Sequence, residues 1–334
     1  MTLEFQADTQ ADGTWRKSQA KGGWRGLLAN QVAIARPDHW FKNVFMLPGA
    51  ALAFAVNPAL ATPSSVASLI VGIIAVCLIA SANYTINEWL DAEFDRHHPV
   101  KRHRPSAAGA VSAPLVYIQW AVLATAGLLL GLTIGLQFTI FAAILLIMGV
   151  AYNVKPLRTK DRVYLDVLSE SVNNPLRFLL GWSAVLGSVL PPSSILLAFW
   201  MGGAYLMAVK RYSEYRFIDD PERAGRYRRS FIYYDEQTLL LSAFFYALTT
   251  TLFLGVFLIK YRIEFLIAFP FVAALFVWYF RIGMQPGSVT QSPEKLYKER
   301  RFIRYVGLLT LLLTALFFVD IPWLNALVEV QSFR

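Results

Sequence analysis

Three polar side chains recur at every fourth position of the stretch NEWLDAEFD, at the end of a long apolar segment: Asn87, Asp91 and Asp95. In an α-helix this spacing places them on one face, over about 12 Å. Two carboxylates and an amide oxygen suit Mg²⁺, which completes its coordination with water and substrate phosphates. The motif therefore predicts a magnesium site and a phosphorylated ligand. The alternative is a solvated helix end, whose acids pair with the basic residues that follow: Arg96, Lys101, Arg102 and Arg104.

A second polar stripe crosses an otherwise apolar segment. Its members lie at i, i+4, i+7 and i+11, the spacing of one helical face: Asp166, Glu170, Asn173 and Arg177. Ionisable groups inside a membrane helix are candidates for function, and the alternative is a buried Glu170, Asn173 and Arg177 network that only holds helices together. Pro175 is expected to loosen this helix, as proline does in membrane helices that line cavities.

A third group of charges lies in residues 210–237. It combines acids with bases: Glu214, Asp219, Asp220 and Asp235 with Lys210, Arg211, Arg226, Arg228 and Arg229. Arginine forks match phosphate oxygens, and the acids could hold a metal, so this segment could bind both. The rule that cytosolic loops are basic would also supply the cations, but it would not require the acids.

The elements that must position these residues are membrane helices. Of the 334 residues, 56% are hydrophobic and only 16% are charged, which suggests the bilayer as solvent. Most of the apolar segments approach the roughly 20 residues that a membrane-spanning helix needs. They predict an all-α, polytopic fold with nine membrane helices, at 44–60, 66–86, 114–135, 138–152, 163–187, 193–209, 238–259, 263–280 and 305–325. The shortest are 138–152 and 193–209.

The nine segments form one predicted catalytic domain, residues 31–325. Residues 1–30 have no apolar core like that of a signal peptide and are expected to form a mobile cytosolic tail, and residues 326–334 a short C-terminal tail. A single cysteine, Cys77, excludes an internal disulfide and a thiolate metal site.

Basic residues give the topology. With nine spans, 27 of the 31 Lys and Arg residues fall on one side of the membrane. The positive-inside rule then predicts a cytosolic N terminus and a site that faces the cytosol, in a multi-pass protein of the inner (plasma) membrane. The net charge of +9 is explained by this topology and by anionic lipid, so nucleic-acid binding is not expected.

These motifs in a nine-helix protein resemble the UbiA superfamily of membrane prenyltransferases. The resemblance rests on the Asn-x-x-x-Asp-x-x-x-Asp motif at the end of the second span and on the polar loop after the sixth. Further stretches resemble its phosphoribosyltransferase branch, whose members act on decaprenyl phosphate: RPDHWFKNVFML at 36–47, DRHHPVKRHRPSAAG at 95–109, YNVK at 152–155, KRYSE at 210–214 and YRRSFIYY at 227–234. The resemblance covers roughly residues 31–320.

The resemblance implies helices around a central cavity, with two acidic regions that bind Mg²⁺ and diphosphate. It assigns the metal to Asn87, Asp91 and Asp95, which with Asp166 and Glu214 are the catalytic candidates. The second region departs from the usual Asp-x-x-x-Asp pattern, which leaves Glu214, Asp219 and Asp220 open as its acid. The candidates for substrate binding are Lys42, Lys101, Arg102, Arg104, Tyr152, Lys155, Arg177, Lys210, Arg211, Arg228 and Arg229.

The predicted reaction is the Mg²⁺-dependent transfer of 5-phosphoribose from phosphoribosyl diphosphate to a polyprenyl phosphate. It releases pyrophosphate and makes a lipid-linked pentose precursor for cell-envelope glycans. The alternative within the family is transfer of a prenyl group from a prenyl diphosphate to an aromatic acceptor, and a remote one is a non-enzymatic transporter. Membrane lipid is an expected partner, and the resemblance is compatible with a homo-oligomer.

Overall fold

The computed structural model describes residues 23–96, 101–261 and 263–324, and within them the chain is helical, with no β-strand. Seven helical segments are long and apolar enough to cross a membrane: α4 (Pro63–Asp95), α5 (Ala113–Ile134), α6 (Leu136–Asn153), α9 (Ser193–Ile218), α11 (Glu236–Tyr261), Ile263–Gly283, which includes α12 (Phe269–Gly283), and α13 (Arg300–Phe318). The two shortest predicted spans correspond to α6 and α9, so both are among the seven. The all-α prediction is confirmed.

Two of the nine predicted spans are shorter than a membrane helix. The segment 44–60 contains the end of the 3₁₀ helix η1 (Pro37–Phe45), α3 (Met46–Val56) and η2 (Pro58–Leu60). The segment 163–187 is divided into α7 (Leu165–Ser171) and α8 (Asn173–Ser183). Pro175 explains the division, because its ring clashes with the carbonyl group of the residue four positions earlier. The expected loosening of this helix is therefore present.

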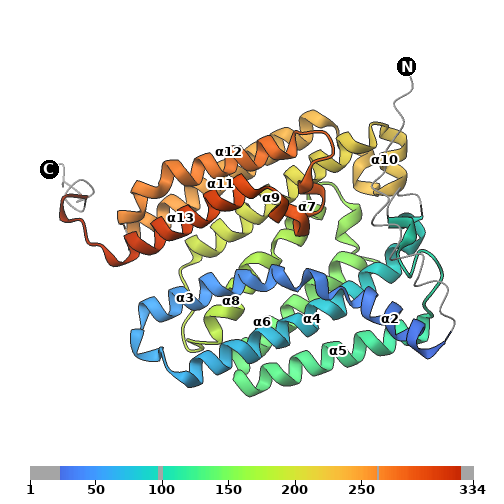
Figure 1. The fold of residues 1–334 in the computed structure, drawn as a ribbon, viewed down its shortest axis with the longest axis horizontal. Coiled ribbons are helices and arrows are strands. Elements are labelled where there is room, and N and C mark those ends of the chain that lie inside the picture. Colours follow the sequence, from blue (N-terminus) through green and yellow to red (C-terminus); the bar gives the residue numbers. More distant parts are fainter. Residues whose placement is uncertain (1–22, 97–100, 262, 325–334) are drawn as a thin grey trace.

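Two of these short helices, α3 and α8, pack closely against each other (Figure 1). A Cβ atom on Gly49 would lie 2.0 Å from the Phe178 carbonyl oxygen, and one on Gly181 would lie 1.8 Å from the Met46 carbonyl oxygen. Only glycine permits such an approach, which is typical of helix pairs in membranes. The contact holds the second half of α8, beside Arg177, against the start of α3.

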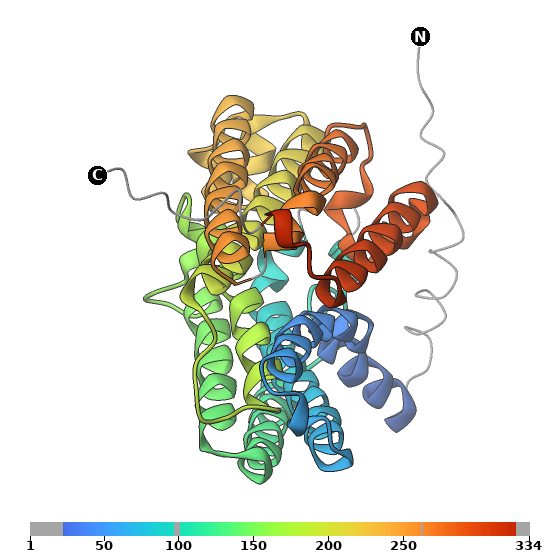
Figure 2. The same ribbon diagram turned by 90° about the vertical axis from the view of Figure 1, so that its left-hand side faces the viewer.

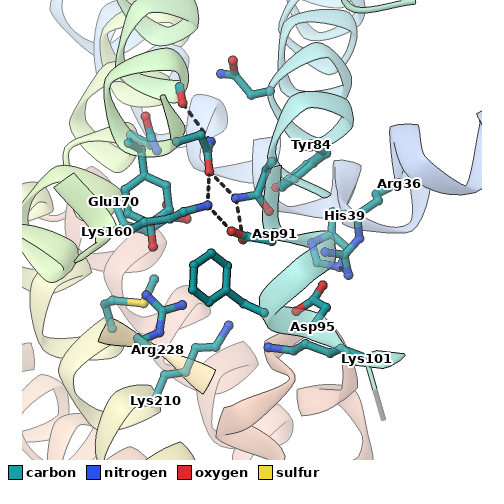
Figure 3. Close-up of a pocket in the computed structure, with 18 of the residues that line it drawn as sticks. Arg36, His39, Tyr84, Asp91, Asp95, Lys101, Lys160, Glu170, Lys210 and Arg228 are labelled. Carbon is teal, nitrogen blue, oxygen red and sulfur yellow. Dashed lines mark hydrogen bonds and ion pairs between the residues drawn. The ribbon is translucent and has the colours of Figure 1, made fainter. Parts of the chain in front are cut away.

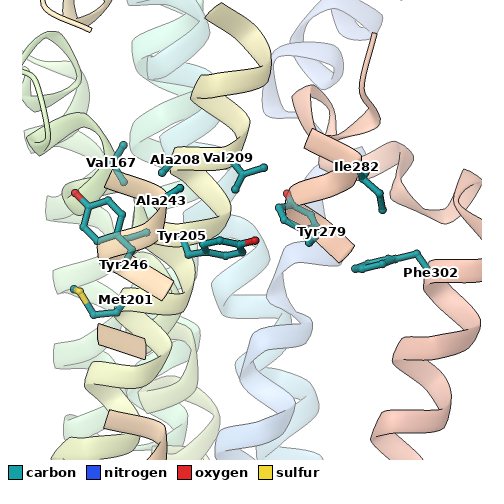
Figure 4. Packing of buried hydrophobic residues seen from close by; sticks show 11 residues of the cluster. Val167, Met201, Tyr205, Ala208, Val209, Ala243, Tyr246, Tyr279, Ile282 and Phe302 are labelled. Carbon is teal, nitrogen blue, oxygen red and sulfur yellow. The ribbon is translucent and has the colours of Figure 1, made fainter. Parts of the chain in front are cut away.

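The long helices lie in two groups that run roughly side by side, α4 to α6 in one and α9 to α13 in the other, as Figures 1 and 2 show. In the second group, aromatic and small side chains of α9, α11, α12 and α13 interlock (Figure 4). The outward faces stay apolar, as on α5, where Leu115, Ile118, Val122, Leu129 and Leu132 are exposed. Such a surface matches contact with lipid.

The charged segments gather at one end of the bundle. There α2 (Trp24–Ala35) packs on α4, and three short elements connect the long helices: η3 (Lys101–His103), η4 (Thr159–Asp161) and α10 (Pro221–Tyr227), which leads into η5 (Arg229–Ile232). Residues 23–30 of the predicted tail include the first turns of α2, whereas residues 1–22 lie outside the described residues, as do 326–334. The remaining short elements are η6 (Ile263–Ala268), η7 (Val289–Gln291) and η8 (Pro293–Lys298).

Candidate active site

One pocket collects charged side chains from η1, α4, α7, α8, α9 and the loops at this end of the bundle (Figure 3). Its lining contains five acids, Asp91, Asp95, Asp161, Glu170 and Glu214, and eleven bases, Arg36, Lys42, Lys101, Arg104, Arg158, Lys160, Arg177, Lys210, Arg211, Arg228 and Arg229. The strong surplus of positive charge makes it a site for anions.

The first acidic motif lines this pocket at all three predicted positions, Asn87, Asp91 and Asp95. Asp91 Oδ1 accepts hydrogen bonds from Lys160 Nζ and, at 3.2 Å, from Arg158 Nη2. Both donors come from the loop between α6 and α7, and the Asp91 contact with Lys160 is drawn in Figure 3. The central carboxylate of the motif is therefore held by cations of this loop and is not simply solvated.

The end of the motif has a similar partner. Arg104 Nη1 donates to Asp95 Oδ2 at 2.6 Å, and both side chains are largely buried. The sequence analysis gave ion pairs between the motif's acids and the following basic residues as the alternative to a metal site. The pair of Asp95 and Arg104 is one of these ion pairs. Although burial opposes the charged guanidinium, the nearby carboxylates of Asp95 and Glu88 raise the pKa of Arg104.

Asn153 joins the motif to the α6–α7 loop. Its Oδ1 accepts from Asn87 Nδ2 and, at 2.7 Å, from Lys160 Nζ, while its own Nδ2 donates to the Gly149 carbonyl oxygen at 2.8 Å. The sequence analysis missed Asn153, Arg158 and Lys160 and selected Lys155 in this loop. The sequence offered a signal for Asn153, a polar residue at the end of an apolar segment, but none that separates Arg158 and Lys160 from Lys155.

The second charged region is centred on Asp166, which is completely buried. It accepts hydrogen bonds from Arg211 Nε at 3.1 Å, Ser230 Oγ at 3.2 Å and Tyr234 Oη at 2.9 Å. These donors belong to the KRYSE and YRRSFIYY stretches, so Asp166 fastens both to α7. It does not line the pocket, and its geometry is that of a positioning residue.

Glu214 is the acid of this region that faces the pocket. It binds Arg211 Nη1 at 2.8 Å and lies 3.9 Å from Lys101 Nζ. By contrast Asp219 and Asp220 are exposed and outside the pocket lining, and Asp220 caps α10 by accepting from the Glu222 and Arg223 amides. Of the three acids that the sequence left open, the structure places only Glu214 in the pocket.

The polar stripe of the fifth predicted span is split by the break between α7 and α8. Glu170, Asn173 and Arg177 line the pocket, and Asp166 does not. Arg177 Nε donates to Asn43 Oδ1 at 3.0 Å, so it also connects α8 to η1. The stripe thus faces the pocket at three of its four positions, and one of these, Arg177, also joins two elements.

The predicted substrate-binding residues divide into two sets. Nine line the pocket, namely Lys42, Lys101, Arg104, Tyr152, Arg177, Lys210, Arg211, Arg228 and Arg229. Arg102 and Lys155 are exposed and do not, because each side chain leaves its loop on the outer side. The pocket also contains Arg36 and His39, which the sequence analysis quoted only within a motif.

Burial shifts the pKa of Lys160 and of His39, which both lie outside the long helices. It lowers the pKa of Lys160 to about 8, although the Asp91 carboxylate acts in the opposite direction. Burial, with the charges of Lys42 and Arg36, lowers the pKa of His39 to about 2, so this imidazole is neutral at physiological pH.

The donor chemistry of the first motif fits Mg²⁺. Among the described residues no three His, Cys, Asp or Glu side chains cluster as a metal site, so the protein alone does not form a complete cage. This is usual for Mg²⁺, which takes one or two carboxylates and completes its shell with water and phosphate oxygens. The Lys160 ammonium donates hydrogen bonds to Asp91 Oδ1 and Asn153 Oδ1. These two oxygens therefore bind a positively charged group in this structure.

Comparison with known proteins gives several relatives that are similar in sequence. The chain is 29% identical to decaprenyl-phosphate phosphoribosyltransferase of Mycolicibacterium smegmatis over 201 residues, which are 60% of this chain and 61% of that protein. It is 32% identical to the Mycobacterium tuberculosis protein of the same name over 202 residues, 60% of this chain and 63% of that protein. The match therefore spans about three fifths of these curated relatives.

Solved structures agree on the fold. A UbiA homolog from Archaeoglobus fulgidus bound to GPP and Mg²⁺ superposes with a TM-score of 0.64 at 20% identity, over 87% of this chain and all of the other. The resemblance to the superfamily and to its phosphoribosyltransferase branch is confirmed. A family model described as the UbiA prenyltransferase family matches residues 43–302. This multi-pass membrane protein belongs to the UbiA prenyltransferase family.

Proposed function

We propose that the protein transfers 5-phosphoribose from phosphoribosyl diphosphate to a polyprenyl phosphate, with release of pyrophosphate and with Mg²⁺ as the cofactor. The product is a lipid-linked pentose for cell-envelope glycans. The names of the M. smegmatis and M. tuberculosis relatives support this choice within the family.

The observation that carries the proposal is the excess of basic residues in the pocket, eleven against five acids. Phosphoribosyl diphosphate brings a diphosphate and a monophosphate, and the lipid acceptor brings another monophosphate. Transfer of a prenyl group to an aromatic acceptor involves only one diphosphate. The larger number of phosphate charges requires the larger number of cations.

The two regions suggest where the groups bind. The diphosphate is assigned to the α4 side, where Asn87, Asp91 and Asp95 would hold Mg²⁺ and Arg158 and Lys160 would meet phosphate oxygens. The remaining phosphates are assigned to the basic residues of the other elements: Lys42, Lys101, Arg104, Arg177, Lys210, Arg211, Arg228 and Arg229. Phe94 separates the two sides, with its ring 5.1 Å from Arg158 Cζ and 5.7 Å from Arg229 Cζ.

In the reaction an oxygen of the lipid phosphate forms a bond to C1 of the ribose as the bond from C1 to the diphosphate breaks. A phosphate monoester is largely ionised at neutral pH, with a second pKa of about 6, so no strong general base is needed. Mg²⁺, when bound, would offset charge on the departing pyrophosphate. The protein's own residues orient both phosphates through Arg and Lys donors and present the Asp91 and Glu214 carboxylates near the cationic ribose.

The topology is part of the proposal. The basic end of the bundle is assigned to the cytosol, with the N terminus, in the plasma membrane, because the predicted nine-span topology puts 27 of the 31 Lys and Arg residues on that side. Residues 31–325 act as one catalytic domain, which receives the lipid from the bilayer. A homo-oligomer is compatible with it.

The test uses purified protein, Mg²⁺, radiolabelled phosphoribosyl diphosphate and a polyprenyl phosphate. We expect label in the organic extract, and none without the lipid or with EDTA. In a parallel reaction the protein receives a prenyl diphosphate and a hydroxybenzoate. Prenylated aromatic product there, with no labelled lipid in the first reaction, would replace the proposal by the aromatic alternative.

A further inference from the structure

Asn153 is an uncharged residue that hydrogen-bonds both Asn87 and Lys160, the loop cation at the first acidic motif. It is 3% exposed and ends α6, directly opposite the motif on α4. The position lies outside the Asn-x-x-x-Asp-x-x-x-Asp pattern, so the motif itself gives Asn153 no role.

The orientation of the Asn153 amide is fixed by its neighbours. A backbone carbonyl can only accept, so the contact to the Gly149 oxygen at 2.8 Å must be made by Asn153 Nδ2. Asn153 Oδ1 therefore faces the pocket. Because Lys160 Nζ can only donate, its 2.7 Å contact with Oδ1 requires the same orientation independently.

The Lys160 ammonium thus lies between a carboxylate oxygen of Asp91 and the amide oxygen of Asn153. Asn87, in contrast, presents its Nδ2 to both of these residues, at 3.3 Å from Asp91 Oδ2. A hard cation prefers carboxylate and amide oxygens. The two oxygens around the Lys160 ammonium are of these kinds, and they come from Asp91 on α4 and from Asn153 on α6.

We propose that Asn153 supplies an amide oxygen to the metal site, and that the Lys160 ammonium is the counter-ion that fills this position until the metal displaces it. The inference rests on the proposed use of Mg²⁺ in this pocket. The proposal adds Asn153, from α6, to the metal ligands of the motif on α4. The Lys160 side chain would then bind Asp91 when the metal is absent and the substrate phosphates when the metal is bound.

The experiment measures Mn²⁺ binding to the detergent-solubilised protein by electron paramagnetic resonance, in titrations with Mn²⁺ alone and with Mn²⁺ plus inorganic pyrophosphate. Asn153→Leu removes the oxygen and should weaken Mn²⁺ binding about tenfold or more in both titrations. Asn153→Asp retains an oxygen there and adds charge, so it should bind Mn²⁺ at least as tightly as the wild type. Lys160→Met removes the competing cation and should tighten binding of Mn²⁺ alone.

Asn83→Leu is the matched control. Asn83 lies one turn before Asn87 on α4 and also bonds to α6, through the Leu145 carbonyl oxygen at 3.0 Å, but it contacts neither acid. Its affinity for Mn²⁺ should equal that of the wild type, and thermal unfolding confirms that each variant is folded.

Equal loss of Mn²⁺ affinity in Asn153→Leu and Asn153→Asp would make the residue a structural bridge and overturn the inference. So would weaker binding of Mn²⁺ alone in Lys160→Met, or no bound Mn²⁺ in either wild-type titration. None of these results depends on turnover. Failure of phosphoribosyl transfer with the Mn²⁺ results intact would therefore reject the proposed function alone.

Discussion

The acids at the centres of the two charged regions, Asp91 and Asp166, differ in access to solvent. The Asp91 side chain is 21% exposed, and its cationic partners come from a single loop. The Asp166 side chain has no exposed surface, and its donors come from α9, η5 and the residues before α11. An accessible acid can exchange its counter-ion for a ligand, whereas an enclosed one fixes its neighbours. One region is suited to binding and the other to holding the pocket in shape.

The strongest test of this difference is Asp91→Asn. Loss of the charge should remove the metal-binding carboxylate and reduce turnover about a thousandfold, as removal of a key electrostatic group does. The folded yield should change less than turnover, since Arg158 keeps its second partner, Asp161, at 3.0 Å, and Lys160 keeps its hydrogen bond to Asn153 Oδ1 at 2.7 Å. Labelled lipid per minute and the size-exclusion profile measure the two effects.

Glu93→Gln is the control for that variant. Glu93 lies on the same helix but is exposed and off the stripe, so turnover should stay at the wild-type rate. Near-normal activity of Asp91→Asn would return the motif to a solvated helix end with structural ion pairs.

Asp166→Asn should act on stability first. Arg211 would remain buried with only Glu214 as its acidic partner, and breaking a buried pair typically costs about 3 kcal/mol. Denaturant unfolding in detergent measures the loss. Asp220→Asn makes the same chemical change at an exposed helix cap and should cost little, because asparagine caps equally well.

The opposite result for this pair is also informative. If Asp166→Asn unfolded like the wild type but gave no labelled product, the buried region would take part in the chemistry itself.

A smaller effect separates two arginines of one basic run. Arg104 lines the pocket and bonds Asp95, whereas Arg102 is exposed. Arg104→Met should raise the KM for phosphoribosyl diphosphate about tenfold, which corresponds to one charged hydrogen bond. Arg102→Met should leave KM as it is. Equal effects would mean that charge in the run acts at long range, and a salt titration of KM would detect this.

Much of the fold could be predicted from the sequence because the bilayer imposes a simple rule on helix length and hydropathy. The seven long apolar segments followed it, including 138–152 and 193–209. Segments 44–60 and 163–187 were also predicted as spans but form shorter helices. The helix α3 ends at Val56, two residues before Pro58, and Pro175 lies just after the break between α7 and α8. A composition window does not detect either proline's effect.

The pocket was predictable where helical spacing decides, as at Asn87, Asp91 and Asp95. The pocket residues in loops were harder to predict, because the direction of a loop side chain depends on the backbone conformation. Arg158 adopts a left-handed φ of 31°, and the turn that follows directs Lys160 into the pocket while Lys155 stays outside. Nothing in the order of these three cations in the sequence indicates which of them faces inward.

The weakest expected effect is a pH dependence that comes from Lys160. Burial lowers its pKa to about 8 in the folded protein, against 10.5 in an ordinary lysine. Between these values the unfolded chain binds more protons than the folded one, so stability contributed by this site rises with pH, by at most about 1.4 kcal/mol per unit. Below pH 8 both states are protonated, and the cost of burying the ammonium is fully present.

In EDTA, the wild type should therefore gain stability relative to Lys160→Met as the pH is raised from about 7.5 to 9.5. The contributions of other titrating groups cancel in the difference in unfolding free energy between the two proteins. Denaturant unfolding in detergent measures this difference at each pH. Lys155→Met, in the same loop but exposed, should show a flat difference. A flat difference for Lys160→Met as well would mean that Asp91 keeps this lysine protonated across the range. The α4 region would then hold its counter-ion as firmly as the Asp166 region does, and the distinction between a binding region and a supporting one would be lost.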